Sequence, residues 1–206
     1  MDIHFTGARM KIQSLHTQAL DIACNRPAQW DERFRTLYKP IEYAFWRSEV
    51  NYYLYLNALV RILKPKKVLE LGTNEGKSAL FMLVAMPEQS QLITIDNQVS
   101  DPPNLALCKE DKRLVTVYGD SLDLSSYNGA DLGGVDLMFI DTEHQFDQLS
   151  QEWGTYYQFL NLGATVVLDD IHINDGMERF WQGLNYPKVD ASDMHAHSGF
   201  GVFRYE

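Results

Sequence analysis

Residues 68–80 read VLELGTNEGKSAL. An apolar strand, residues 68–71, runs into a glycine turn at residues 72–76, and a helical segment follows from Ser78. A strand, a glycine turn and a helix in this order are typical of nucleotide-binding α/β proteins. The turn nevertheless lacks the G-x-G-x-x-G pattern of dinucleotide-binding folds and the complete pattern of a P-loop. The stretch therefore predicts an α/β fold whose ligand remains to be identified from other residues.

Strands and helices alternate along the rest of the chain. Further strands are expected at residues 92–95, 114–118, 135–140 and 164–168, with helical segments at 78–86, 104–108 and 145–160. This alternation predicts a mostly parallel sheet covered on both faces. Residues 185–189 and 199–205 are expected to add an antiparallel hairpin at one edge.

The first 64 residues differ from the rest. Apolar spacing predicts a helix over residues 9–25, and an aromatic-rich segment at 41–63 predicts a second helix that Pro65 ends. We expect residues 1–64 to form a helical lid on a core of residues 65–206, within a single domain overall. The aromatic side chains are expected mainly to pack, although one end of the second helix could cover a ligand site.

Composition limits the classes of partner. The chain has 206 residues, 45% of them hydrophobic, and a formal net charge of -10. This charge argues against a nucleic acid or an anionic membrane surface as partner, because either requires clustered Lys and Arg. Two cysteines without a metal-binding spacing fit a reducing compartment. With neither a signal pattern nor a membrane-spanning run, we expect a soluble, cytoplasmic protein.

Polar residues, nearly all acidic, stand at the end of every strand expected in the parallel part of the sheet. They are Glu70, Asp96, Asp120 with Ser121, Asp141, and Asp169 with Asp170. A single acid at such a place is commonly the cap of the next helix. Five strand ends that share the feature instead predict one acidic cleft, because ligands of open α/β sheets bind at the carboxyl ends of the strands.

The acidity of this cleft constrains its ligand. It would repel a diphosphate, which argues against NAD and nucleoside triphosphates. Asp96, at the end of the second strand, is placed to accept hydrogen bonds from both hydroxyls of a ribose. A ligand with a ribose and positive rather than negative charge fits these features. S-adenosylmethionine, with its sulfonium and ammonium groups, is such a ligand.

The ordered set VLELGTNEGKS, ITID, VYGDS, FIDTEH and VVLDD resembles the class I S-adenosylmethionine-dependent methyltransferases. Within them it is most similar to metal-dependent O-methyltransferases of small molecules, such as catechol O-methyltransferase and macrolide and sugar O-methyltransferases. The resemblance covers residues 65–182 and extends through the last hairpin. It implies a Rossmann-like sheet of seven strands.

The resemblance also implies roles for individual residues. Gly72 would let the backbone approach the methionine part of the cofactor, Ser78 would bind its carboxylate, and Asp96 would hold the ribose. The implied cofactor-binding set is Glu70, Gly72, Asn74, Gly76, Ser78, Asp96, Asp120, Ser121 and Asp141, with Asp120 and Ser121 on the adenine side. Asp141, Asp169 and Asp170 correspond to ligands of a divalent metal.

The chemistry of the three aspartates is consistent with Mg²⁺, which prefers oxygen ligands and would lower the pKa of an acceptor hydroxyl. Asp169 and Asp170 are neighbours, so both can bind one ion only if the strand has already ended; otherwise one of them caps the next helix.

His144 is the expected general base, because one helical turn after Asp141 would return it to the same side. It replaces the lysine of catechol O-methyltransferase. The alternative is a histidine at a helix start, bonded to the backbone or to Asp141. His172, His195 and His197 are expected at the surface or in a solvated loop.

Two departures argue against a catechol substrate. Glu143 stands where the catechol enzyme has Trp, and the C-terminal segment DMHAHSGFGVFRYE differs from that enzyme's substrate wall. A hydroxyl of a sugar or natural product is expected instead.

Other functions stay open: a metal-free methyltransferase with His144 as base, or a non-catalytic protein that binds S-adenosylmethionine. An NAD-dependent oxidoreductase is disfavoured by the acidic cleft. The sequence also leaves open whether copies of the chain form a homo-oligomer.

Overall fold

A computed structural model describes residues 10–25, 51–98, 100–194 and 198–206 of the chain. The first part of the helix expected at 41–63, and His195 and His197, lie outside the described residues. The division of the chain at residue 65 stays a prediction.

The seven strands form one sheet in the order β3-β2-β1-β4-β5-β7-β6. The strands are β1 (Lys67–Leu71), β2 (Gln91–Asp96), β3 (Leu114–Tyr118), β4 (Val135–Ile140), β5 (Leu160–Asp169), β6 (Lys188–Asp190) and β7 (Phe200–Arg204). β1 to β5 pair in parallel, whereas β7 is antiparallel to both β5 and β6. The expected fold class, a mostly parallel sheet with an antiparallel C-terminal hairpin, is confirmed.

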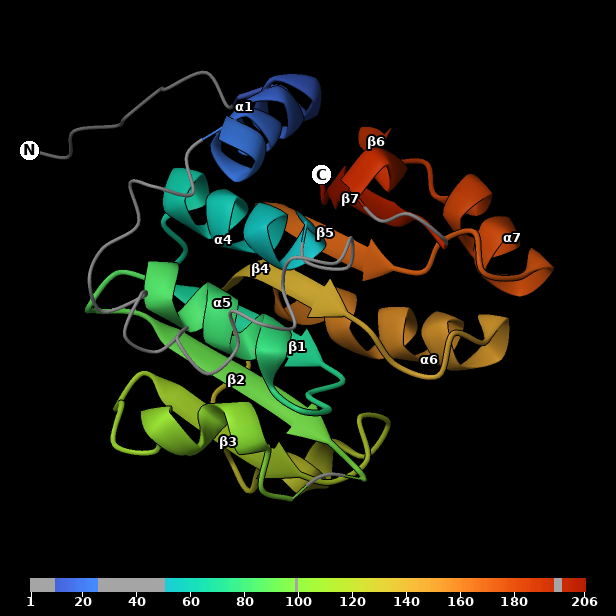
Figure 1. Ribbon diagram of the computed structural model, residues 1–206. Helices are drawn as coiled ribbons and strands as arrows, with labels where there is room; N and C mark the ends of the chain where they lie inside the picture. The colour runs from blue at the N-terminus through green and yellow to red at the C-terminus, as the bar shows by residue number, and fades with distance from the viewer. Residues whose placement is uncertain (1–9, 26–50, 99, 195–197) are drawn as a thin grey trace, which may run out of the picture.

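Helices cover both faces of this sheet (Figure 1). The α-helices are α1 (Ile12–Asn25), α4 (Asn51–Leu63), α5 (Lys77–Ala85), α6 (Phe146–Tyr156) and α7 (Asp175–Gly183). Short 3-10 helices are η2 (Pro103–Cys108), η3 (Leu124–Tyr127), η4 (Tyr157–Phe159) and η5 (Ser192–Met194). Among the described residues, no helix has the length and apolar character needed to cross a bilayer.

Alternation along the strands divides the apolar core into two halves. Val68 and Leu137 face α1, α4 and α5, while Leu69 and Met138 face α6 and α7. Successive strand residues point to opposite faces, so a strand covered on both sides reads as an unbroken apolar run. The N-terminal helices α1 and α4 therefore belong to the same layer as α5.

Three elements depart from the predictions. α7 was not expected; Asn174 caps it by accepting a hydrogen bond from the Met177 backbone N–H at 3.0 Å. β5 starts at Leu160, where a helix to residue 160 was expected, because α6 ends at Tyr156 and η4 completes the turn. β6 lies at 188–190, later than the expected 185–189.

Candidate active site

The candidate site lies where the direction of strand order reverses. β1 is followed by β2 and β3 on one side, and β4 by β5 on the other, so the carboxyl ends of β1 and β4 flank the reversal point. A cavity of about 270 Å³ opens there. Its lining residues come from the ends of all these strands except β5: Gly72, Asn74, Ile95, Asp96, Asn97, Gln98, Gly119, Ser121, Asp141, Thr142, Glu143, His144 and Gln148.

Gly72 makes the close approach of β1 and β4 at this point. Its φ of +92° is disfavoured for residues with a side chain, and a Cβ there would lie 1.8 Å from the carbonyl oxygen of Asp141. The Asp141 N–H donates to the Leu71 carbonyl at 2.9 Å, and the Gly72 N–H donates to the Ile95 carbonyl at 2.9 Å. Only glycine can hold this turn against both neighbouring strands.

Asp96 is anchored at the second strand end. Its carboxylate accepts hydrogen bonds from the backbone N–H groups of Asn74 and Gln98, both at 2.7 Å, and it lines the cavity. Each carboxylate oxygen can accept more than one hydrogen bond, so the group can still receive ligand hydroxyls. The ribose contact of Asp96 stays a prediction.

Glu70 and Ser78, two predicted cofactor contacts, do not line the cavity. Glu70 is fully buried beneath the glycine turn and accepts a hydrogen bond from the Thr94 hydroxyl. Burial raises the pKa of Glu70 to about 8, although hydrogen bonds from Ser78 and Thr94 oppose the shift. Thr94 lies 2.6 Å from the Thr73 hydroxyl. These residues support the turn from inside the protein.

Two further predicted contacts also lie outside the cavity lining. Gly76 caps α5 at a φ of 81°, and a Cβ there would meet the Leu105 side chain. The Asp120 side chain accepts a hydrogen bond from the Leu122 backbone N–H at 2.9 Å. Of the nine predicted cofactor residues, the structure thus brings Gly72, Asn74, Asp96, Ser121 and Asp141 to the cavity.

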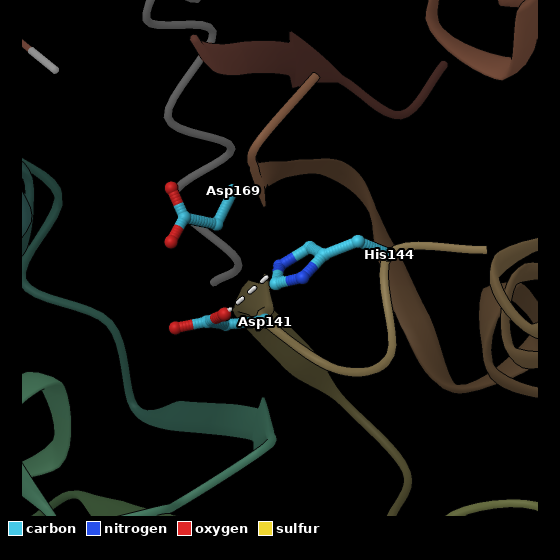
Figure 2. Close-up of side chains that lie close together, drawn as sticks. All are labelled: Asp141, His144 and Asp169. Atoms are coloured by element: carbon cyan, nitrogen blue, oxygen red, sulfur yellow. Dashed lines mark ion pairs between the residues drawn. The ribbon is translucent and has the colours of Figure 1, made fainter. Parts of the chain in front are cut away.

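Asp141 and Asp169 stand side by side because of the sheet register. Ile140 pairs with Leu168 in the parallel ladder, so the next residue of each strand projects to the same face. Ligand atoms of Asp141, His144 and Asp169 all lie within 4.8 Å of one another, and Figure 2 shows the three side chains converging. Burial, followed by the charges of Asp141 and Asp170, raises the pKa of Asp169 well above its usual range.

Asp170 lies beside this group, and its role as a metal ligand stays a prediction. β5 ends at Asp169 and Asp170 has a left-handed φ of 54°, so the two carboxylates need not point to opposite faces. Asp170 is not in the group of ligand atoms that lies within 4.8 Å. Its Oδ1 accepts a hydrogen bond from the Ser198 hydroxyl, and its Oδ2 lies 3.3 Å from His144 Nε2.

His144 lies beside Asp141 as predicted, but not through a turn of helix. Residues 141–145 are not helical, α6 begins at Phe146, and His144 has a left-handed φ of 51°. Its Nε2 lies 3.2 Å from Asp141 Oδ1, and the Asn174 side chain donates to its carbonyl at 2.8 Å. Burial lowers the pKa of His144, but pairing with Asp141 and the charges of Asp170 and Glu152 outweigh it, so the pKa is raised.

Tyr52 and Tyr53, at the start of α4, lie near Asp141 and Asp169. Burial raises the pKa of each hydroxyl, and the charges of Asp169 and Asp141 raise it further. The two rings are in contact, with centroids 4.0 Å apart. Neither residue lines the cavity, so the expectation that one end of the aromatic helix covers a ligand site stays a prediction.

Sequence reasoning missed Glu152, which is fully buried behind the cavity. Its carboxylate accepts hydrogen bonds from Ser121, Thr142 and Gln148, all of which line the cavity. Burial raises its pKa, and these three hydrogen bonds oppose the shift. The detectable signal was an acid on the buried stripe of α6, between Leu149 and Tyr156.

Comparison with known proteins agrees with this architecture. A curated catechol O-methyltransferase of Niastella koreensis is 28% identical over 135 residues, covering 59% of this chain and 56% of that protein. The match therefore spans about half the length of the curated relative.

Two solved structures share the fold. An O-methyltransferase from Bacillus cereus, in complex with SAH, matches with a TM-score of 0.65 and 16% identity, covering 93% of this chain and 97% of the other. The second is the O-methyltransferase TomG from Streptomyces achromogenes, which is involved in tomaymycin synthesis and was solved in complex with SAM. It matches with a TM-score of 0.63 and 17% identity, covering 100% of this chain and 96% of the other.

The family profile of the methyltransferase domain matches residues 69–171, which is half of the chain. The matched region begins in β1 and includes Asp169 and Asp170 at the end of β5. This match confirms the methyltransferase resemblance that the sequence carries. The chain belongs to the methyltransferase domain family.

Proposed function

We propose that this protein transfers the methyl group of S-adenosylmethionine to a hydroxyl of a small molecule, with the help of a divalent cation. The observation that carries the proposal is the convergence of Asp141, His144 and Asp169 beside a cavity that Asp96 also lines. Family membership and structural relatives that bind SAM or SAH support the choice of cofactor.

The acidic group fits a divalent cation. Asp169 is 5% exposed, and its Oδ1 has no hydrogen-bond partner among the described residues. A buried carboxylate beside two others is costly unless a cation or a proton balances the charge. Asp141 and Asp169 would hold the ion, and the charge of Asp170 lies beside them. When bound, the cation would lower the pKa of the acceptor hydroxyl.

His144 is proposed as the general base. Its Nε2 lies between Asp141 and Asp170, at 3.2 Å and 3.3 Å, and neither contact has hydrogen-bond geometry. The two carboxylates would stabilise the imidazolium that forms when His144 takes the proton of the acceptor hydroxyl. Asp141 would thus serve both the base and the cation.

The acceptor is proposed to be a hydroxyl of a sugar or natural product. Glu143 and Gln148 line the cavity, and the charges of Asp141 and Asp169 act on the buried hydroxyls of Tyr52 and Tyr53. Polar side chains in the lining, with aromatic residues near Asp141 and Asp169, suit a polyhydroxylated ring.

A panel of hydroxylated sugars and natural products, assayed for formation of S-adenosylhomocysteine, tests this proposal. Turnover of at least one compound should be abolished by EDTA, restored by Mg²⁺, and lost in Asp141→Asn. Activity retained in both conditions would refute the role of the cation.

A metal-free methyltransferase is the second candidate. One observation favours it: His144 Nε2 lies 3.2 Å from Asp141 and 3.3 Å from Asp170, and a histidine between two carboxylates can act as a base without a metal. EDTA-resistant turnover that His144→Ala abolishes would select this function.

A further inference from the structure

The cavity wall formed by Ser121, Thr142 and Gln148 rests on one buried carboxylate. Glu152 is 0% exposed. It accepts from the Ser121 hydroxyl at 2.7 Å, from the Thr142 hydroxyl at 2.8 Å and from the Gln148 amide at 2.9 Å. The Ser121 backbone is fixed as well, since the Tyr156 hydroxyl donates to its carbonyl and lies 2.8 Å from the Tyr127 hydroxyl.

These hydrogen bonds determine what the wall can offer a ligand. A hydroxyl has a single hydrogen, and Ser121 and Thr142 both direct theirs to the carboxylate. Three donors point at the two oxygens of Glu152, which favours its ionised form, and an ionised carboxylate accepts hydrogen bonds and has none to donate. The Gln148 nitrogen also faces Glu152 and lies 3.4 Å from the Ser121 hydroxyl, which leaves its carbonyl oxygen. The three side chains therefore present only hydrogen-bond acceptors to the cavity.

We propose that Glu152 is a positioning residue that fixes this wall, defined by Ser121, Thr142 and Gln148, as an acceptor-only surface and thereby selects a purine with an amino group over one with an oxo group. The inference rests on the proposed function and on the role that the resemblance implies for Ser121, on the adenine side of the cofactor. The exocyclic amino group of adenine donates hydrogen bonds to such a surface. The oxygen of hypoxanthine would face oxygen lone pairs instead.

A merely structural role for Glu152 predicts something different. Loss of a buried carboxylate that supports three side chains would loosen the wall and weaken all ligands alike. A role in setting the direction of the hydrogen bonds changes the ratio between amino and oxo ligands. The ratio of two dissociation constants thus separates the two roles.

The test is calorimetric titration of the full chain with S-adenosylhomocysteine and with S-inosylhomocysteine at pH 8. Wild type should prefer the adenosyl ligand by about tenfold or more, the value of one good hydrogen bond exchanged for a repulsive contact. In Glu152→Gln the amide must donate to one neighbouring oxygen, which turns a hydroxyl hydrogen toward the cavity. The preference should then fall by about fivefold or more. Glu110→Gln, at an exposed glutamate, should keep the wild-type ratio.

Ser121→Ala provides a second variant if Glu152→Gln fails to fold, because it removes an acceptor from the wall and should also reduce the preference. An unchanged ratio in the folded variants, or no preference in wild type, overturns the inference. Wild-type protein that does not bind S-adenosylhomocysteine at all would instead refute the proposed function, and this inference would fail with it.

Discussion

Gly72→Ala is expected to disrupt the site through one backbone contact. The residue has a φ of +92°, and the added Cβ would lie 1.8 Å from the Asp141 carbonyl oxygen. That distance is far inside the ~3.5 Å at which such atoms normally touch. The contact is with backbone, so no rotation of a side chain can relieve it, and the end of β4 must move away from β1.

The magnitude has two parts. A side chain in the left-handed region costs about 1–2 kcal/mol. Overpacking against a fixed backbone adds about 1–3 kcal/mol. Their sum, about 2–5 kcal/mol, corresponds to a fall in Tm of roughly 4–20 °C for a chain of this size. Displacement of Asp141 should also weaken S-adenosylhomocysteine binding.

Gly129→Ala is the matched control, because Gly129 has a similar φ of +81° but a Cβ there would meet nothing within 4 Å. It should cost only the conformational part, about 1–2 kcal/mol, and leave ligand binding unchanged. Urea unfolding and calorimetric titration measure the two effects. Equal destabilisation by the two substitutions, with binding retained in both, would refute the proposed contact between the glycine turn and β4.

The remaining predictions concern proton and metal chemistry. His144→Ala should lower turnover by about 10²–10⁴-fold while S-adenosylhomocysteine still binds, and His144→Lys should restore part of the rate; undiminished turnover in the alanine variant would exclude His144 as the base. Burial raises the pKa of Glu70 to about 8, so the folded protein keeps a proton that the unfolded chain loses above about pH 4.5. The free energy of unfolding in urea should therefore fall between pH 4.5 and 8, by up to about 1.4 kcal/mol per pH unit. If this free energy depends on pH as steeply in Glu70→Gln as in wild type, the prediction is contradicted. Asp169→Asn should raise the Tm of the metal-free protein, because it removes a buried charge beside Asp141 and Asp170. It should also abolish the increase in Tm that Mg²⁺ causes in wild type. An undiminished increase in Tm with Mg²⁺ in the variant would count against Asp169 as a ligand.

Elements with strong apolar signals were predictable from the sequence. β1 to β4 lie within one residue of the expected ranges, because parallel strands buried on both faces read as short apolar runs. α7 was missed, since its start at Asn174-Asp175-Gly176 resembles a turn, and its cap becomes evident only through the Asn174 hydrogen bond.

The site was predicted in outline but not in its local geometry. Acids at the strand ends indicated the cleft, and Asp141 and Asp169 do meet there, because that depends only on strand pairing. His144 reaches Asp141 through a left-handed backbone conformation, which its sequence neighbours do not specify. Glu70 does not line the cavity, because it lies two residues after Val68 and points to the same face of the sheet, where it pairs with Ser78 of α5. The position of Glu152 on the buried stripe of α6 was a signal in the sequence, but its three hydrogen-bond partners depend on how α6 packs on the sheet.

Binding of S-adenosylhomocysteine is the most direct test of the central claim, since it requires no knowledge of the acceptor. Calorimetry should show one site on the wild-type chain, with affinity weakened by about 10-fold to 100-fold in Asp96→Asn, which loses the charge that receives the ribose hydroxyls. NAD⁺ should not bind, because its diphosphate would enter an acidic cleft. Binding of NAD⁺ without binding of S-adenosylhomocysteine would contradict the account.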